Sequence, residues 1–236
     1  MSSALSLWIV IPAYNEESVI AGVLEELHAA AAQWSTLRAD VVVTDDCSSD
    51  NTCSVVRRFP VHLCRHVVNL GQGAALQTGI DYALQNGADI VVTYDSDGQH
   101  TPDSISKLVE PLINHEAEIA LGTRFASGAS AENISASKTV TLKSAVLFTR
   151  ITTGLEITDT HNGLRAFTRL AAQKIRITQN RMAHASEILS EIARSKLPYK
   201  EVPVRIRYTE YSMAKGQKIG NALNILWESF FGKVLR

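Results

Sequence analysis

The chain has 236 residues, of which 45% are hydrophobic and 20% are charged, a composition that suits a folded globular domain and excludes a disordered chain. The formal net charge is −1, so no overall basic field argues for a nucleic-acid-binding protein. The charge is unevenly spread, because residues 196–236 carry eight Lys or Arg and three Asp or Glu, which makes a basic tail after an acidic body.

The cysteines and the N-terminus indicate a cytoplasmic protein. Cys47, Cys53 and Cys64 have no metal-ligand spacing and cannot all pair with one another, which favours a reducing compartment. The apolar run Leu7 to Pro12 is too short for a signal peptide and follows no basic segment. No stretch approaches the roughly 20 apolar residues that cross a bilayer, so we expect a protein that is soluble or lies on the cytoplasmic face of a membrane.

The first predicted strand is the continuous apolar run Leu7 to Pro12, which is typical of a parallel strand that is buried on both faces. The polar turn Ala13 to Glu17 follows it and leads into a predicted helix from about Ser18 to Gln33. Open α/β sheets bind ligands at the carboxyl ends of their strands, so this turn is a candidate ligand loop. The alternative is an ordinary strand-to-helix connection.

The second predicted strand, Asp40 to Thr44, ends in the polar stretch Asp45 to Thr52. Its Ser and Asp residues are candidates for capping the next helix, but capping explains one or two of them and leaves a cluster of carboxylates. A carboxylate at this position can accept a hydrogen bond from a nucleobase imide N–H or from ribose. Asp46 is the candidate for the base.

The third predicted unit comprises the strand Val61 to Cys64, the stretch Asn69 to Ala75, and a helix that ends near Gln85. Gly71 and Gly73 allow the backbone to approach either a ligand or a neighbouring element closely. As a phosphate-binding motif the pair is weak, because it lacks the Lys-Ser/Thr ending of a P-loop and the third glycine of a dinucleotide fingerprint.

The fourth predicted unit carries the most informative loop. The strand Val91 to Tyr94 leads into two acidic residues, Asp95 and Asp97, and alternation along an extended chain sends both side chains to the same side. Gln99 continues this spacing. Oxygen ligands of this kind suit Mg²⁺ or Mn²⁺, which completes its coordination with the phosphates of a nucleotide diphosphate. The alternative is a solvated Asp-Gly turn.

The alternation of strands and helices continues with a helix from Pro102 to Asn114 and a strand from Glu118 to Leu121. This order predicts an α/β fold with a doubly wound, mostly parallel sheet. Right-handed crossovers place all the loops that follow the strands at one edge of that sheet.

Six polar motifs follow one another along the chain. They are Ile11–Glu16, Asp45–Asp50, Asn69–Ala74, Asp95–His100, Gly122–Phe125 and Asp159–Phe167. These motifs and their order resemble family 2 glycosyltransferases, and within that family the dolichol-phosphate mannosyltransferase group. The resemblance implies a GT-A fold with helical additions on the acceptor side and at the C-terminus, an inverting transfer from a nucleoside-diphosphate sugar, and a divalent metal.

The resemblance also implies roles for individual residues. The residues that would hold the nucleoside are Pro12, Tyr14, Glu16 and Asp46. The residues that would hold the metal and the diphosphate are Asp95, Asp97 and Gln99, while Arg124 would face the donor phosphate or the acceptor. Many relatives carry Lys at the position of Gln72, and its absence removes a cation near the donor.

The mechanism requires a search for a general base. A bound metal neutralises the charge that develops on the leaving diphosphate, which makes Asp97 a catalytic residue. An acceptor hydroxyl needs a base, whereas an ionised acceptor phosphate does not. The candidates are Asp159 and Glu187, the latter in a stretch of helical apolar spacing. The alternatives are a structural partner of Arg165 for Asp159 and an exposed helix carboxylate for Glu187.

The C-terminal third contains three further predicted features. The segment Ser135 to Gly154 is compatible with an amphipathic helix, which packs either on the core or at a membrane surface. Tyr199 to Tyr208 alternates as a strand. The following loop, Thr209 to Lys218, contains Lys215 and predicts a lid over the diphosphate, with a solvated basic loop as the alternative.

The last residues form a predicted amphipathic helix. Trp227, Phe230 and Phe231 lie beside Lys233 and Arg236, a pattern that favours peripheral contact with an anionic membrane surface, with a homo-oligomer contact as the alternative. We therefore divide the chain into a glycosyltransferase domain, residues 1–217, and a C-terminal helix, residues 218–236.

The functional hypothesis is a metal-dependent inverting glycosyltransferase that transfers a sugar to a glycan or lipid-linked acceptor during polysaccharide or glycolipid assembly. One alternative is a polyprenyl-phosphate sugar synthase of the dolichyl-phosphate mannose type. A second is a non-catalytic sugar-nucleotide-binding protein. A sugar nucleotidyltransferase is disfavoured, because Ile11 to Asn15 replaces the Gly-rich opening that such an enzyme would carry.

Overall fold

The computed structural model describes residues 4–125, 130–131, 146–160, 162–180 and 183–207. Lys215 and the predicted helix 218–236 lie outside the described residues. In the described part of the chain, no helix combines the length and the apolar character that a membrane span requires.

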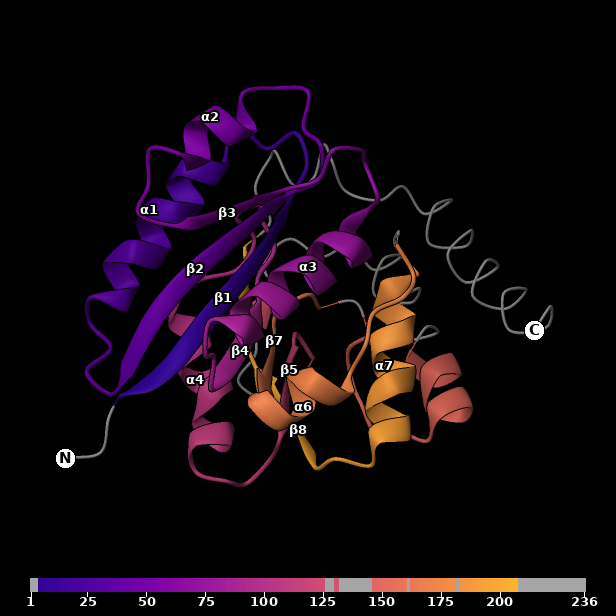
Figure 1. The fold of residues 1–236 in the computed structure, drawn as a ribbon. Helices are drawn as coiled ribbons and strands as arrows, with labels where there is room; N and C mark the ends of the chain where they lie inside the picture. Colours follow the sequence, from indigo (N-terminus) through magenta and orange to yellow (C-terminus); the bar gives the residue numbers. More distant parts are fainter. Residues whose placement is uncertain (1–3, 126–129, 132–145, 161, 181–182, 208–236) are drawn as a thin grey trace.

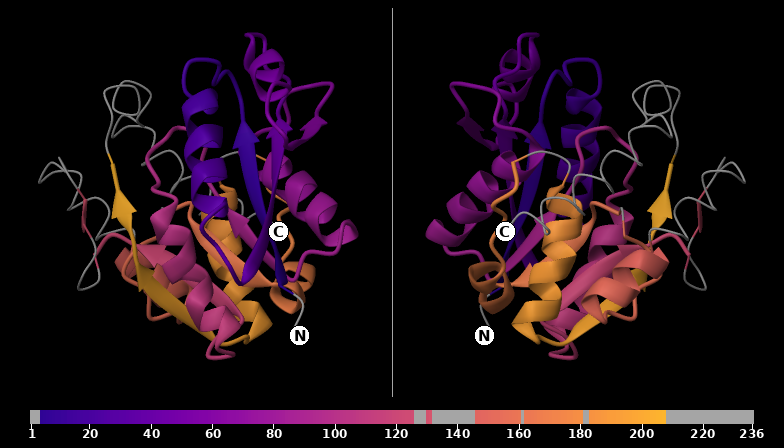
Figure 2. Two further views of the ribbon diagram at one scale, coloured as in Figure 1. Left: turned by 90° about the vertical axis from the view of Figure 1, so that its left-hand side faces the viewer. Right: turned by 90° about the vertical axis from the view of Figure 1, so that its right-hand side faces the viewer.

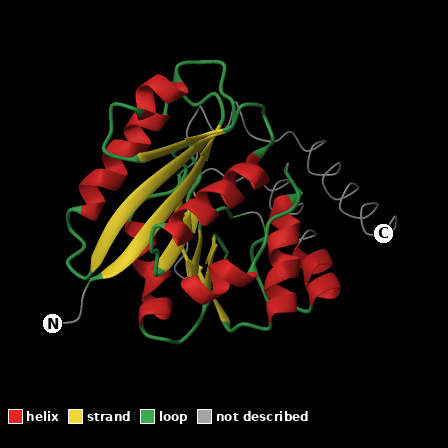
Figure 3. Ribbon diagram, viewed as in Figure 1, coloured by secondary structure: helices red, strands yellow, loops and turns green. Residues whose placement is uncertain are grey.

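Seven strands form the central sheet, and helices cover both of its faces (Figure 1, Figure 3). In chain order the strands are β1 (Leu5–Ala13), β2 (Leu37–Asp45), β3 (His62–Arg65), β4 (Ile90–Thr93), β5 (Ile119–Thr123), β7 (Arg165–Thr168) and β8 (Tyr199–Pro203). In space they follow the order β3-β2-β1-β4-β7-β5-β8. β7 runs antiparallel to both β4 and β5, and the other pairings are parallel. The prediction of a mostly parallel α/β sheet is confirmed.

The described helices connect the strands. They are α1 (Ile20–Ala31), α2 (Thr52–Val56), α3 (Gln72–Gln85), α4 (Asp103–Ile113), α6 (Arg169–Lys174), α7 (His184–Ser195) and a helix over residues 146–153. α6 is absent from the sequence-based prediction, because six residues are too few to show a helical period. The Thr168 hydroxyl caps this helix by accepting a hydrogen bond from the backbone N–H of Ala171.

One prediction about strands is wrong. The stretch Tyr199 to Tyr208 is not continuous, because β8 ends at Pro203 and a separate strand, β9 (Arg205–Ile206), pairs with β6 (Ser130–Ala131) in a small second sheet. Proline cannot donate to a strand ladder, so the break follows directly from the sequence at this position.

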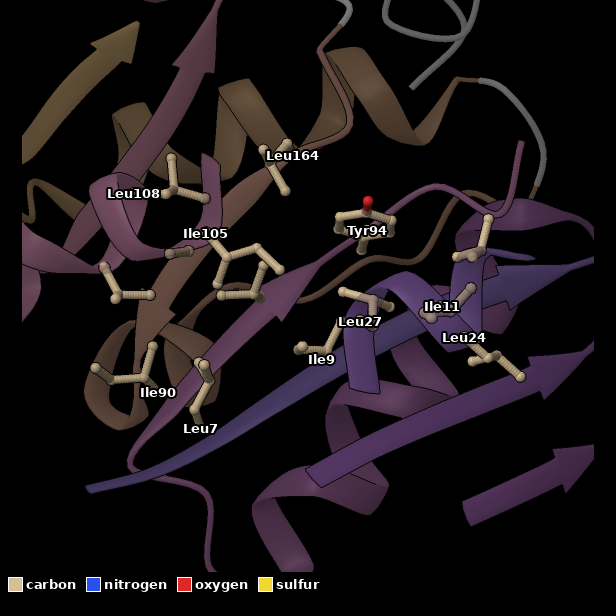
Figure 4. Close-up of a cluster of buried hydrophobic side chains, with 14 of the residues drawn as sticks. Leu7, Ile9, Ile11, Leu24, Leu27, Ile90, Tyr94, Ile105, Leu108 and Leu164 are labelled. Atoms are coloured by element: carbon tan, nitrogen blue, oxygen red, sulfur yellow. The ribbon is translucent and has the colours of Figure 1, made fainter. Parts of the chain in front are cut away.

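The strand β1 explains how the two sides of the sheet are filled. Leu7, Ile9 and Ile11 are fully buried on the face that α1 and α4 cover (Figure 4). Trp8 and Val10 point to the opposite face, where α3, α6 and α7 pack. Figure 2 shows these two helical layers on either side of the strands. A strand that is apolar at every position therefore has helices on both sides, as the sequence predicts.

Candidate functional site

The loops that follow β1, β2 and β4 lie together at one edge of the sheet. β1 and β2 end side by side, with Ala13 opposite Asp45 in the strand register. The backbone N–H of Asp46 donates to the Ala13 carbonyl at 2.8 Å, and that of Tyr94 donates to the Val10 carbonyl at 2.9 Å. The main chain thus brings three of the polar motifs, those that follow β1, β2 and β4, to a common edge.

The loop after β4 holds its two carboxylates differently. Asp95 accepts hydrogen bonds from His100 Nε2 at 3.0 Å and from the Gln72 side-chain amide at 3.2 Å. Asp97 accepts one from the backbone N–H of Gln99 at 3.0 Å. Gln72 therefore contacts an acidic residue of this loop, a role that its sequence position does not reveal.

The two carboxylates also differ in acidity. Burial and the neighbouring Asp95 charge raise the pKa of Asp97 to about 6. Burial alone would raise the pKa of Asp95, but the hydrogen bond and charge of His100, together with Arg165, hold it below its ordinary value. Asp97 is the carboxylate of the pair that lacks enough positive charge around it.

This environment fits a divalent cation. The described residues contain no group of three or more His, Cys, Asp or Glu side chains that could hold a metal, so any metal here has few protein ligands. Mg²⁺ and Mn²⁺ sites that include substrate phosphates use one or two carboxylates in this way. Burial and the Asp95 charge both disfavour the ionised form of Asp97, and a cation there would stabilise that form. Metal binding by Asp95, Asp97 and Gln99 stays a prediction.

The raised pKa of Asp97 has a measurable consequence for the metal-free protein. Because the pKa is higher in the folded state (about 6) than its ordinary value of 3.8, the folded state binds more protons between these two pH values. The contribution of Asp97 to the free energy of unfolding therefore falls as the pH rises from about 4 to about 6. We expect urea unfolding at pH 4.5 and pH 7 to show this loss in the wild type and not in Asp97→Asn. Equal pH dependence of the two proteins would contradict it.

Among the residues predicted to hold the nucleoside, Tyr14 and Glu16 lie in the loop after β1, which hydrogen bonds connect to the loop after β2. Asn15 has a left-handed backbone with φ of 55°, and its side-chain oxygen accepts from the backbone N–H of Ser49 at 2.9 Å. The backbone N–H of Glu16 donates to the Thr52 hydroxyl at 2.8 Å. Between them these bonds hold Tyr14 at the edge of the sheet with 46% of its surface exposed. Contact between Tyr14 and a nucleobase stays a prediction.

Asp46 has a structural function that the sequence does not show. Its carboxylate is buried and accepts hydrogen bonds from His66 Nδ1 (2.8 Å) and from the backbone N–H groups of Leu70 (2.8 Å) and Gly71 (2.6 Å). His66 Nε2 is in turn 2.9 Å from the Thr78 hydroxyl. Asp46 thereby folds the loop that precedes α3. Contact between Asp46 and a nucleobase stays a prediction, and His66 lies in no motif that would have indicated it.

The glycine pair serves close packing. Gly71 has φ of 99°, a conformation that favours glycine. A Cβ at Gly73 would lie 2.0 Å from the carbonyl oxygen of Gln179, and the Gly73 N–H donates to the Asn180 carbonyl at 2.9 Å. For Gly73 the close approach is therefore to a neighbouring segment of the chain.

Arg124 and Asp159 form a bidentate ion pair. Arg124 Nε lies 2.7 Å from Asp159 Oδ2, its Nη2 lies 2.8 Å from Oδ1, and its backbone N–H also donates to Oδ2 at 3.1 Å. The Arg124 side chain is 8% exposed and the Asp159 side chain is fully buried. Asp159 thus binds Arg124 by hydrogen bonds, and its charge also acts on Arg165, the partner that the sequence offered as an alternative.

Arg165 lies beside this pair as a buried cation on β7. Burial lowers the pKa of its guanidinium, while the charges of Asp95 and Asp159 oppose that shift. Arg165 therefore interacts electrostatically with Asp95, in the loop after β4, and with the Arg124–Asp159 pair. The antiparallel strand that carries it places it between the two.

Glu187, the second candidate base, binds the segment that precedes α7. One carboxylate oxygen accepts from the backbone N–H groups of Thr178 (3.0 Å) and Gln179 (2.9 Å), and the other accepts from the Thr178 hydroxyl. These bonds hold the segment that packs against Gly73. The role of Glu187 as a base stays a prediction.

Comparisons with known proteins relate this arrangement to a family. Residues 8–176 match the family described as Glycosyl transferase family 2. The chain is 32% identical to a UDP-N-acetylglucosamine–dolichyl-phosphate N-acetylglucosaminyltransferase of Methanococcus voltae, over 97% of this chain and 98% of that protein. It is 30% identical to a polyprenol monophosphomannose synthase of Mycolicibacterium smegmatis, over 71% of this chain and 63% of that protein.

The fold is also similar to that of a solved enzyme. Glucosyl-3-phosphoglycerate synthase from Mycobacterium tuberculosis, in complex with Mn²⁺, UDP-glucose and phosphoglyceric acid, superposes with a TM-score of 0.71. The alignment covers 96% of this chain and 77% of that chain at 18% sequence identity. At this identity the similarity concerns the fold.

Proposed function

The chain belongs to glycosyl transferase family 2, with a GT-A fold and relatives of the dolichol-phosphate mannosyltransferase type, and we propose that it transfers a sugar from a nucleoside-diphosphate sugar to a polyprenyl phosphate. In this proposal the reaction depends on Mg²⁺ or Mn²⁺ and inverts the anomeric carbon. We prefer a polyprenyl phosphate to the hydroxyl group of a glycan as the acceptor.

One observation carries this preference. Both carboxylates that the sequence nominates as a general base are already engaged, Asp159 by the Arg124 guanidinium and Glu187 by donors at Thr178 and Gln179. A hydroxyl acceptor needs a base to remove its proton, whereas a phosphate monoester is already ionised near neutral pH. With an acceptor that needs no base, neither of these two carboxylates has to remove a proton.

The relatives support the same acceptor class. The Methanococcus voltae protein is named for transfer to dolichyl phosphate, and the Mycolicibacterium smegmatis protein for synthesis of a polyprenol monophosphate sugar. The first of these relatives aligns over nearly its whole length. For this chain, the sugar, the nucleoside and the polyprenyl acceptor remain proposals.

In the proposed mechanism, an oxygen of the acceptor phosphate forms a bond to the anomeric carbon, and the bond from that carbon to the diphosphate oxygen breaks. The bonding electrons leave with the nucleoside diphosphate. A divalent cation, when bound, stabilises the negative charge on this leaving group. Asp97 and Asp95 would hold that cation, and His100 and Gln72 fix the orientation of Asp95. Arg124, oriented by Asp159, would face the acceptor phosphate.

A direct test compares acceptors that differ by one group. We expect transfer from a nucleoside-diphosphate sugar in Mn²⁺ to a short-chain polyprenyl phosphate, and none to the matching polyprenol or to a soluble oligosaccharide. Equal transfer to the polyprenol would overturn the proposed acceptor. Removal of metal with EDTA should stop the reaction, and re-addition of Mn²⁺ should restore it.

Donor binding is measured separately from transfer. A nucleotide at about 100 times its dissociation constant should stabilise the protein by roughly 2.7 kcal/mol in a thermal-shift assay with Mn²⁺. Stabilisation without transfer to any acceptor would favour the non-catalytic sugar-nucleotide-binding alternative. Peripheral membrane contact through residues 218–236 is part of the proposal and brings the enzyme to a lipid-linked acceptor.

A further inference from the structure

Glu201 is a partly buried carboxylate on β8, the strand at the edge of the sheet. Its Oε1 accepts hydrogen bonds from the backbone N–H groups of Thr158 at 2.7 Å and Asp159 at 3.3 Å. Its Oε2 accepts from the Thr158 hydroxyl at 2.9 Å. These three bonds fix the backbone on which the Asp159 side chain stands.

A chain of hydroxyl groups extends from Glu201 towards Arg124. Thr158 Oγ1 lies 2.7 Å from Thr123 Oγ1, and the backbone N–H of Phe125 donates to Thr123 Oγ1 at 3.2 Å. An ionised carboxylate can only accept and a backbone N–H can only donate. Every hydrogen bond in the chain therefore runs in one direction, from Phe125 through Thr123 and Thr158 to Glu201.

The residues that follow Glu201 also hold the backbone next to Arg124, the other member of the ion pair. The backbone N–H of Val204, three residues after Glu201, donates to the Thr123 carbonyl at 3.0 Å. Arg124 follows Thr123 directly, and its guanidinium is held in two places by Asp159. Residues 201–204 therefore anchor both members of the Arg124–Asp159 pair.

We propose that Glu201 is a positioning residue for sugar transfer, which sets the direction of the Arg124 guanidinium through Thr158 and Asp159. This inference rests on the proposed function, in which Arg124 faces the acceptor phosphate. In this role Glu201 acts through other residues of the chain. It acts because a bidentate pair transmits the position of the carboxylate to the arginine, and small displacements of a phosphate-binding group slow a reaction.

The neighbouring strand residue supplies a matched control. Lys200, next to Glu201 on β8, pairs with Glu116 on the surface, where both side chains are about half exposed. Glu116→Gln makes the same chemical change as Glu201→Gln at a place that no described hydrogen bond links to Arg124. Exposed ion pairs contribute little to stability, so this variant should behave as the wild type.

In Glu201→Gln the side-chain shape is retained, but the charged acceptor of the Thr158 hydroxyl is replaced by an amide nitrogen that donates, so the hydrogen bond between Thr158 and Thr123 has to reverse its direction. We expect the KM for polyprenyl phosphate to rise about tenfold, the size of effect expected when a hydrogen bond to a charged group is replaced by a neutral one. The half-saturating Mn²⁺ concentration and the thermal shift with nucleotide and Mn²⁺ should not change. Thr158→Val should have a similar effect, and the double variant should be no worse than either single one.

The possible outcomes distinguish a failure of the proposed function from a failure of the positioning role of Glu201. If the wild type does not use polyprenyl phosphate, the proposed function fails. If the wild type is active and Glu201→Gln and Thr158→Val match Glu116→Gln in every parameter, the positioning role is wrong. It is equally wrong if these two variants lower acceptor use, metal dependence and nucleotide stabilisation together, because that pattern indicates general damage to the fold.

Discussion

Asp97→Asn lowers sugar transfer by about a thousandfold or more while the protein stays folded. The substitution removes the charge of the carboxylate that is proposed to hold the metal, and with it the stabilisation of the leaving diphosphate. Asparagine has nearly the same size, so the packing around position 97 is kept. The measurement is the initial rate of transfer at saturating donor and Mn²⁺, together with thermal unfolding monitored by circular dichroism.

A matched variant controls for the chemical change itself. Asp103 lies exposed in the first turn of α4, close in sequence to Asp97, and Asp103→Asn makes the same substitution away from the site. We expect it to retain transfer within about twofold, because exposed substitutions change stability by no more than about 0.5 kcal/mol. Full activity of Asp97→Asn would refute the assignment of Asp97.

Gly163→Ala lowers transfer by about a hundredfold. A Cβ at this position would lie 2.2 Å from Asp95 Oδ2 and 2.6 Å from Oδ1, which is far closer than non-bonded atoms approach. Because the Gly163 carbonyl accepts from the Thr93 hydroxyl at 2.7 Å, its backbone is held and the carboxylate must move instead. A displacement of about 1 Å in a catalytic group can cost a hundredfold in rate.

The control for this prediction is another glycine. A Cβ at Gly22, within α1, would meet no atom within 4 Å. Gly22→Ala should leave transfer unchanged and stabilise the protein by about 0.5 to 1 kcal/mol, because alanine favours a helix. Both variants are assayed for transfer and for Mn²⁺ dependence. If Gly163→Ala and Gly22→Ala are equally active, the close contact with Asp95 has no role in the reaction.

Much of the fold follows from local patterns in the sequence. The uninterrupted apolar run of β1 predicts a strand that is buried on both faces, and the structure confirms helices on both sides. The direction of β7 is not predictable in this way, because alternation along a strand describes its faces and not the strand that lies beside it. Its antiparallel pairing with β4 depends on contacts between residues more than 70 positions apart.

For the site, the sequence predicts which residues are important but not which residues they bind. The sequence identifies Asp46, Asp159 and Glu187 as carboxylates near the carboxyl ends of strands or in a neighbouring loop and helix. Their hydrogen-bond donors come from other segments, such as Arg124, which is 35 positions from Asp159. From the sequence, Glu201 is only a charged residue in a predicted strand. Its three hydrogen bonds to Thr158 and Asp159 depend on the tertiary structure.

The position of β7 also determines how the sheet can be completed during folding. Residues 5–93 supply β3, β2, β1 and β4, which are close in sequence and can pair as a parallel unit as soon as they are made. Among the described strands, β5 and β8 join this unit through β7, which begins at Arg165. Until that strand emerges, the edge of β4 stays open to pairing with other chains. The half of the sheet that carries Asp46 and Asp95 can therefore form early, while the half that carries Arg124 and Asp159 waits for the later part of the chain.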